Sequence, residues 1–104
     1  MNFNEKVYAA CKSIPKGQIS TYKEIAHAIN TKAYRAVGNA LNKNPFGFSY
    51  DGDVPCHRVV QSNGKVGGFA HGTKKKIELL EKEEIKIKNN KIVEFEKKCF
   101  KFAR

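Results

Sequence analysis

A cysteine followed directly by a histidine and an arginine is the feature of this sequence best suited to nucleophilic chemistry. The residues from Pro55 to Val59 read Pro-Cys-His-Arg-Val. A thiol near neutral pH is mostly protonated, and a neighbouring imidazole and guanidinium both favour the reactive thiolate. Cys-His pairs also occur by chance, and catalytic cysteine and histidine residues are usually distant in sequence. The pattern alone leaves two interpretations of Cys56, a reactive thiol or a chance pairing.

The other two cysteines, Cys11 and Cys99, have no comparable neighbours. Cys11 lies on the apolar face of an expected helix and is predicted to be a small core residue. Cys99 lies in a basic, aromatic tail and is predicted to be a bystander thiol. The chain has no Cys-x-x-Cys pair, no Cys/His spacing typical of zinc sites and no glycine pattern typical of nucleotide sites. We therefore expect neither a metal nor a cofactor.

The chain is short and strongly basic. It has 104 residues, with 20 Lys and Arg against 10 Asp and Glu, and a formal net charge of +10. This charge favours a polyanionic partner, nucleic acid first and an anionic membrane surface second. A Lys-rich surface is also common in thermophiles and in AT-rich genomes. No run of about 18 apolar residues predicts a membrane span, and the N-terminus has no apolar signal core. We expect a monomer in the cytoplasm, or in the nucleus of a eukaryote.

Apolar periodicity predicts three helices in the first half of the chain. The first covers residues 3–13. The second begins near Thr21, which forms a capping box with Glu24. The third covers residues 32–43 and contains Gly38, whose helix-propensity cost of about 1 kcal/mol suggests a close approach by another helix or by a DNA backbone.

The second and third of these helices are joined by a short turn, which suggests a helix-turn-helix. Short helical pairs are common in proteins, so this pattern alone does not identify a DNA-binding motif. The third helix is lined with small residues, and these allow close contact with a groove but few base-specific hydrogen bonds. Sequence-independent binding is therefore favoured; the small residues are Ala33, Ala36, Gly38, Asn39 and Ala40.

A fourth helix is predicted over residues 74–83, capped by Thr73 and beginning with a run of three lysines. Those cations oppose the helix dipole, a conflict that a neighbouring polyanion or solvent exposure relieves. Residues 85–95 predict a hairpin with a three-residue loop, Asn89-Asn90-Lys91, which pairs Ile87 with Val93 and Ile85 with Phe95. The predicted fold is mainly α: a winged helix-turn-helix-like three-helix bundle with an additional C-terminal helix and a small β-hairpin wing.

Several separated motifs together resemble one family, the O6-alkylguanine-DNA alkyltransferases, also called methylated-DNA–protein-cysteine methyltransferases. VPCHRVVQSNGKVGGFAHG is similar to the active-site segment of that family, GQISTYKEIA to the start of its helix-turn-helix, RAVGNALNKNP to its recognition helix, and LLEKEEIKI to its C-terminal helix. The similarity covers about residues 3 to 95, nearly the whole chain, with the motifs in the family's order.

The resemblance implies a DNA repair enzyme that acts once. Such a protein binds duplex DNA through the minor groove, rotates O6-alkylguanine out of the stack and transfers the alkyl group irreversibly to its own cysteine. Its partner is double-stranded DNA that contains O6-alkylguanine, such as O6-methylguanine, and it uses no cofactor. Attack on an alkyl carbon needs a thiolate and an in-line approach, which fits the residue types around Cys56.

The resemblance also implies catalytic roles. Cys56 matches the alkyl acceptor, His57 the histidine that takes the thiol proton through a water, and Glu83 the glutamate that orients that histidine. Tyr22 matches the tyrosine that favours nucleotide rotation and donates to the guanine. Asn44 matches the asparagine that holds the active-site turn together.

Contacts with DNA and with the guanine are implied in the same way. Arg35 matches the arginine that fills the gap left by the flipped base. The other expected DNA contacts are Tyr22, Ala36, Gly38 and Asn39, and the expected pocket residues are Val59 through its carbonyl, Ala70 through its N–H, and Phe69 through its ring.

The sequence departs from the family in two ways. The chain is expected to be a single domain over residues 1–104, without the N-terminal domain of larger members. The loop before Pro55 is longer than in many relatives, and its Asp51 and Asp53 are expected to point away from DNA phosphates.

Two alternatives stay open. One is an alkyltransferase-like protein that binds alkylated DNA and signals to other repair without transfer. Relatives of that kind generally lack the acceptor cysteine and often have tryptophan there, whereas this chain has Cys56 and no tryptophan. The other is a small winged-helix transcription regulator, for which the Cys-His pair is a coincidence.

Overall fold

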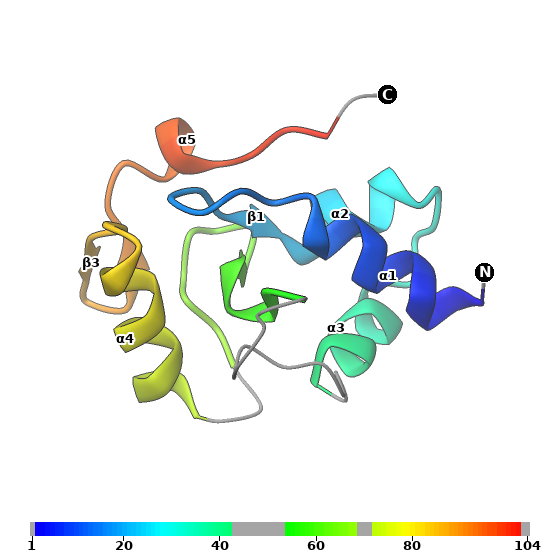
Figure 1. Ribbon diagram of the computed structural model, residues 1–104, viewed down its shortest axis with the longest axis horizontal. Coiled ribbons are helices and arrows are strands. Elements are labelled where there is room, and N and C mark those ends of the chain that lie inside the picture. Colours follow the sequence, from blue (N-terminus) through cyan, green and yellow to red (C-terminus); the bar gives the residue numbers. More distant parts are fainter. Residues whose placement is uncertain (1, 43–53, 69–71, 103–104) are drawn as a thin grey trace.

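Three helices pack on one another in the N-terminal part of the computed structural model, which describes residues 2–42, 54–68 and 72–102 (Figure 1). They are α1 (Phe3–Lys12), α2 (Tyr22–Ala28) and α3 (Tyr34–Asn42). Side-chain caps fix two of the starting points. Asn2 and Glu5 form a reciprocal capping box at α1, and the Thr21 hydroxyl accepts a hydrogen bond of 3.0 Å from the Glu24 N–H at α2. The predicted helices are confirmed, with slightly shorter ends.

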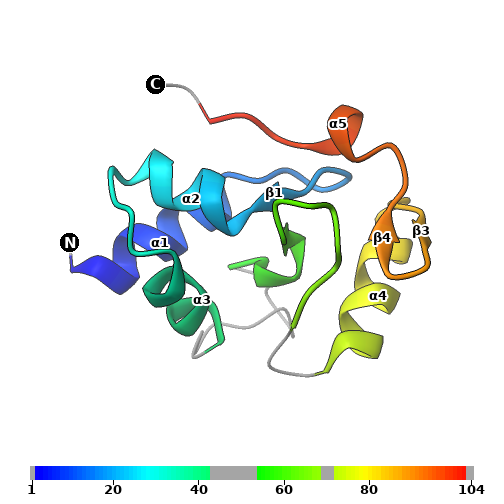
Figure 2. The same ribbon diagram turned by 180° about the vertical axis from the view of Figure 1, so that it is seen from behind.

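A short parallel sheet connects this bundle to the rest of the molecule. β1 (Ser20–Thr21) pairs with β2 (Val59–Val60), so that Ser20 lies opposite Val59 and Thr21 opposite Val60. The C-terminal segment lies along the other side of β1. There the Ile19 N–H donates to the Lys98 carbonyl at 2.9 Å, and the Phe100 N–H donates to the Ile19 carbonyl at 2.6 Å. In both ribbon views the C-terminal segment runs beside β1 (Figures 1 and 2).

The second half of the chain contains η1 (Cys56–Arg58), α4 (Thr73–Lys82) and a hairpin of β3 (Ile87–Lys88) and β4 (Lys91–Ile92). A short helix that the sequence did not predict, α5 (Phe95–Lys98), follows the hairpin. The predicted cap of α4 was wrong. Thr73 is the first helical residue, Gly72 takes the cap position with a φ of 92°, and the Thr73 hydroxyl donates instead to the Gly67 carbonyl at 3.4 Å.

The predicted hairpin register was also wrong. Ile87 pairs with Ile92 and Lys88 with Lys91, which leaves a two-residue turn of Asn89 and Asn90. Both turn residues have a positive φ, 53° and 62°, as a type I′ turn requires. Continued along both strands, this register would place Ile85 opposite Glu94. The chain avoids that pair, because Glu94 adopts a left-handed conformation with a φ of 58° and begins the turn into α5.

We expect Asn90→Val to destabilise the protein by about 1–2 kcal/mol, because a β-branched side chain tolerates a left-handed backbone poorly. The free energy of unfolding in urea measures this cost. Lys88→Val is the matched control, since Lys88 is exposed in β3 and valine suits a strand. Equal stability of the two variants would contradict the observed turn.

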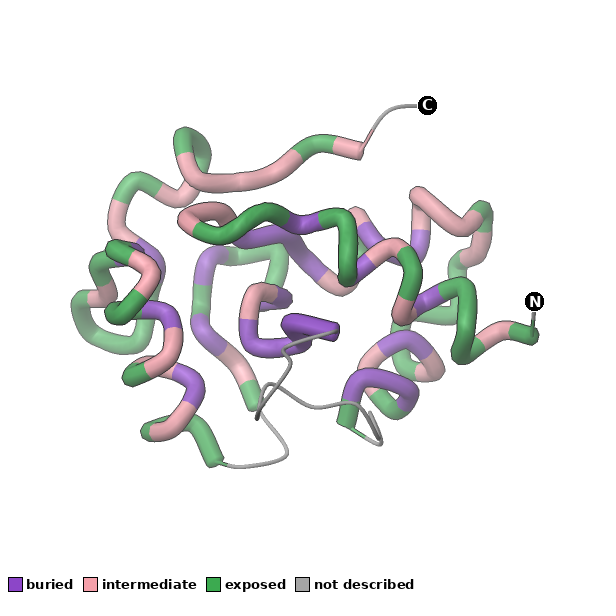
Figure 3. Tube along the Cα trace, viewed as in Figure 1, coloured by how far each residue is buried: buried purple, intermediate pink, exposed green. Residues whose placement is uncertain are grey.

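The two strands of the parallel sheet lie between two apolar clusters. Val59 packs in the first cluster with residues of α1, α2 and α3, and Val60 packs in the second with Leu80 and Ile85. Successive strand residues point to opposite faces, so adjacent valines serve different clusters. Buried residues gather around this centre (Figure 3). The fold is mainly helical with little sheet, as predicted, and among the described residues no helix is long and apolar enough to cross a membrane.

Candidate active site

Cys56 begins a 3-10 turn between the two apolar clusters. Its N–H donates to the Val54 carbonyl at 2.8 Å, and the Arg58 N–H donates to the Pro55 carbonyl at 2.9 Å. The turn leads directly into β2, whose pairing with β1 fixes its orientation. The Cys56 residue is 6% exposed and belongs to the first cluster. Only a small part of the Cys56 residue is therefore exposed.

His57 and Arg58 both bind the carboxylate of Glu83, which ends α4. The His57 Nε2 lies 3.0 Å from Oε2 of Glu83. Arg58 donates to both oxygens of that carboxylate, from Nε at 2.8 Å and from Nη2 at 2.7 Å, and its Nη1 donates to the Ile14 carbonyl at 2.8 Å. Burial raises the pKa of Glu83, but the hydrogen bonds and charges of His57 and Arg58 outweigh it and lower that pKa to about 2. Glu83 is therefore ionised at neutral pH.

The contact with Glu83 selects the free nitrogen of His57. A neutral imidazole that donates from Nε2 to a carboxylate has its acceptor lone pair on Nδ1. This Nδ1 is buried, and no hydrogen-bond partner for it occurs among the described residues. His57 can therefore accept a proton at Nδ1 while Glu83 stabilises the resulting charge.

Tyr22 is the first residue of α2 and reaches toward the glycine-rich segment. Its hydroxyl donates to the Gly68 carbonyl at 3.5 Å. Burial raises the pKa of Tyr22 to about 12, and the negative forms of Cys56 and Cys11 add to that effect. The phenol is therefore neutral near neutral pH and can donate a hydrogen bond.

A lysine that sequence reasoning did not select also lies here. Lys76 is fully buried, and its ammonium donates to the Gly68 carbonyl at 3.1 Å and lies 5.7 Å from the centre of the Tyr22 ring. The sequence predicts that the three lysines at the start of α4 face solvent or a polyanion. The feature that indicates burial is the helical spacing, because Lys76 is four residues before the buried Leu80 and lies on the same helix face.

Apart from Tyr22, the residues expected to contact DNA lie on α3, on the side away from the core. Arg35 and Asn39 are exposed, and Ala36 and Gly38 are half-buried. A Cβ built on Gly38 has no described atom within 4 Å, so no described part of the protein packs closely against this glycine. The neighbouring Val37 is fully buried in the first cluster.

The remaining predicted positions are less informative. Val59 is fully buried, and its expected contribution is a backbone carbonyl. Five predictions lie outside the described residues, namely those on Asn44, Asp51, Asp53, Phe69 and Ala70.

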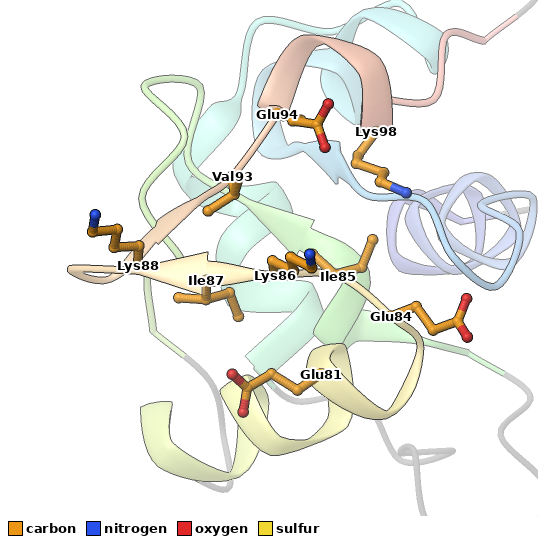
Figure 4. A pocket seen from close by; sticks show the side chains of 9 residues that line it. All are labelled: Glu81, Glu84, Ile85, Lys86, Ile87, Lys88, Val93, Glu94 and Lys98. Atoms are coloured by element: carbon orange, nitrogen blue, oxygen red, sulfur yellow. The ribbon is translucent and has the colours of Figure 1, made fainter.

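One groove of the described residues lies away from this site. It lies between the end of α4, the hairpin and α5, and it is lined by charged side chains of both signs around Ile85, Ile87 and Val93 (Figure 4). None of the predicted site residues lines it. In the described parts of the chain, no group of three His, Cys, Asp or Glu residues could hold a metal ion.

The chain is similar in sequence to known proteins. The family model described as "6-O-methylguanine DNA methyltransferase, DNA binding domain" matches residues 2–85. A methylated-DNA–protein-cysteine methyltransferase of Methanosarcina mazei is 48% identical over 87 residues, which are 83% of this chain and 52% of that protein. The protein of the same name from Saccharolobus solfataricus is 45% identical over 85 residues, with 82% and 52% covered. The chain spans about half the length of these curated relatives.

Solved structures give the same result. OGT of Mycobacterium tuberculosis in complex with DNA matches with a TM-score of 0.74 and 40% identity, over 81% of this chain and 49% of that chain. Atl1 of S. pombe, in complex with damaged DNA containing O6-carboxymethylguanine, matches with a TM-score of 0.78 and 30% identity, over 95% of this chain and 94% of that chain. With the family model covering most of the sequence, the chain belongs to the 6-O-methylguanine DNA methyltransferase family, whose DNA-binding domain it contains.

Proposed function

We propose that this chain repairs double-stranded DNA by transferring the alkyl group of O6-alkylguanine irreversibly to its own Cys56. The observation that carries the proposal is the junction of two separate segments at the reactive turn. His57, next to Cys56, contacts Glu83 at 3.0 Å, although Glu83 is 26 residues away in sequence. An isolated Cys-His pair has no such support, whereas a thiol beside a histidine oriented by a carboxylate is an activated nucleophile.

The proposed transfer uses three side chains of the site, those of Cys56, His57 and Tyr22, with Glu83 stabilising the charge on His57. His57 takes the proton of the Cys56 thiol at Nδ1, directly or through a water, and Glu83 stabilises the imidazolium. The thiolate attacks the alkyl carbon in line, so that the S–C bond forms as the C–O6 bond breaks. The guanine leaves with the electron pair of that bond and takes a proton from the hydroxyl of Tyr22, which is neutral near pH 7, and the proton held by His57 returns to Tyr22 through water. The cysteine stays alkylated, so each molecule acts once.

The DNA contacts belong to the same proposal. Here α2 and α3 act as a helix-turn-helix on the minor groove, and Arg35 replaces the flipped base in the stack. Ala36, Gly38 and Asn39 meet the DNA backbone, which would explain a glycine that no described residue closely approaches. The wing role of the hairpin stays part of the proposal, although the hairpin lies beside α4, at the other end of the molecule from α3 (Figures 1 and 2).

The remaining roles complete the proposal. Asn44 holds the reactive turn, and Val59, Phe69 and Ala70 line the guanine pocket, as in the family. The chain acts as a monomeric single domain, in the cytoplasm or nucleus, and needs no cofactor.

The decisive experiment is to incubate the protein with a duplex oligonucleotide containing O6-methylguanine and to weigh it by mass spectrometry. We expect a gain of one methyl group on the peptide that contains Cys56. An unchanged mass after incubation with excess substrate would contradict alkyl transfer.

A second candidate is lesion binding without transfer. It is favoured by the match to Atl1, which extends over nearly the full length of both chains. The same experiment separates the two functions, because lesion-selective binding without a mass gain supports the second. Binding with no preference for the lesion would contradict both and leave a DNA-binding regulator.

We expect Arg35→Ala to slow repair of duplex DNA about 10-fold or more, because flipping costs a few kcal/mol that the inserted side chain helps to offset. Reaction with free O6-methylguanine needs no flipping and should keep its rate. Lys32→Ala, an exposed cation just before α3, is the control for a general loss of charge. If both substrates slowed equally, the role of Arg35 in flipping would be wrong.

A further inference from the structure

Lys76 is the largest fully buried side chain of the described residues. Of the two lysines that precede it, Lys74 is exposed and Lys75 is half-buried. A buried ammonium is costly unless it is paired and hydrogen-bonded, and an apolar residue of similar size usually serves stability better. The sequence keeps a lysine at this position at a cost to stability, which points to a use for the charge.

The ammonium connects two parts of the candidate active site. Lys76 Nζ donates to the Gly68 carbonyl at 3.1 Å, and the same carbonyl accepts a hydrogen bond of 3.5 Å from the Tyr22 hydroxyl. The ammonium also lies 5.7 Å from the centre of the Tyr22 ring, within the range of cation–π attraction. Three segments therefore meet at one point: the start of α2, the glycine-rich segment and the first turns of α4.

We propose that Lys76 is a positioning residue for alkyl transfer: its ammonium holds the Tyr22 ring and the Gly68 carbonyl together, so that the Tyr22 hydroxyl is fixed where the guanine leaves. This inference rests on the proposed function. It adds a positioning residue to the candidate active site, and fast alkyl transfer then requires the charged form of Lys76.

The charge on Lys76 is lost within an accessible pH range. Burial lowers the pKa of Lys76 to about 8, although the negative forms of Cys56 and Cys11, from η1 and α1, act in the opposite direction. Among the described residues, the other titratable group that faces it is Tyr22, from α2, whose pKa is raised to about 12. As the pH rises through about 8, the ammonium becomes an amine, and the cation–π attraction disappears.

Activity and stability should then change in opposite directions. In the unfolded chain Lys76 stays protonated to about its ordinary pKa of 10.5, so between pH 8 and 10.5 the unfolded state binds more protons than the folded state. The contribution of Lys76 to stability therefore rises with pH in this range, whereas the transfer rate should fall. A purely structural role for Lys76 predicts no such fall.

The test compares Lys76→Met and Lys76→Arg with the wild type, using Lys74→Met as the matched control from the same helix. The measurement is the single-turnover rate constant of methyl transfer from saturating O6-methylguanine duplex, between pH 6.5 and 10, together with Tm. We expect Lys76→Met to lose about 10²-fold at pH 7.5 with an unchanged or higher Tm, the scale of loss that a misplaced catalytic group causes. Lys76→Arg should keep more than a tenth of the rate and lose the alkaline fall, because a guanidinium does not titrate there.

Each contrary outcome has one meaning. A wild-type chain that gains no methyl group overturns the proposed function, and this inference with it. A wild type that transfers while Lys76→Met reacts within threefold of it overturns the role of Lys76 alone. So does a Lys76→Arg variant as slow as Lys76→Met, or an alkaline fall that persists in Lys76→Arg. Lys74→Met should match the wild type at every pH.

Discussion

Replacing Cys56 with serine is expected to abolish alkyl transfer and to leave binding of alkylated DNA in place. A hydroxyl has a far higher pKa than a thiol, so the neighbouring His57 cannot ionise it to a useful extent at neutral pH. The side chain is only slightly smaller and lies in a turn held by backbone hydrogen bonds, so the fold should be kept. The measurement is the mass of the protein after incubation with excess O6-methylguanine duplex, with binding followed by electrophoretic mobility.

The other two cysteines supply the controls for this prediction. Burial raises the pKa of Cys11 and also that of the half-buried Cys99, so neither thiol is activated. Cys99→Ser should transfer at the wild-type rate. A Cys56→Ser variant that still gained one methyl group would place the acceptor elsewhere, and peptide mapping would identify it.

Changing Glu83 to glutamine is expected to have the second-largest effect, on both reaction and stability. The carboxylate accepts one hydrogen bond from His57 and two from Arg58. The amide of glutamine has a single acceptor oxygen, and its NH₂ group would face a donor. Breaking a largely buried charge pair costs about 3 kcal/mol, and loss of general-base assistance costs about 10²-fold or more in rate. Single-turnover transfer and urea unfolding measure the two effects.

Glu84→Gln provides the matched control, because Glu84 is the next residue and is exposed. It should be nearly neutral in both assays. The pH dependence has a definite sign: the pKa of Glu83 is lowered from 4.5 to about 2, so its stabilisation is complete above pH 4.5 and is lost as the pH falls toward 2. A Glu83→Gln variant whose stability fell between pH 4.5 and 2 as steeply as that of the wild type would contradict the role of this pair.

The helices could be predicted because they depend on local patterns. The apolar stripe of α1 and the cap at Thr21 are visible in a few neighbouring residues, and the structure has both. The hairpin register could not be predicted from strand pairing alone. It depends on Asn89 and Asn90 adopting left-handed conformations and on Glu94 leaving the ladder, which is a choice between turns of similar energy.

The site could be predicted only in part, and for a different reason. Cys56 and His57 are adjacent, but their relation to Glu83 came from family resemblance, because a contact across 26 residues leaves no local pattern. Arg58 was considered only as a charge near the thiol, whereas its guanidinium binds Glu83 and the Ile14 carbonyl. Lys76 was missed because lysine is rarely buried, so the three lysines at the start of α4 were expected to face solvent or a polyanion.

The position of the C-terminal segment has a consequence for the exposed edge of the small sheet. β1 finds its first neighbour, β2, about forty residues later, and Ile19, the residue before β1, is paired only by the segment from Lys98 to Phe100. Without that segment, Ile19 and Ser20 present an unpaired edge that can join another chain. Expression of residues 2–85, the span that the family model matches, would keep that edge open permanently. A shortened chain of this kind should therefore aggregate more readily than one that keeps Lys98 to Phe100.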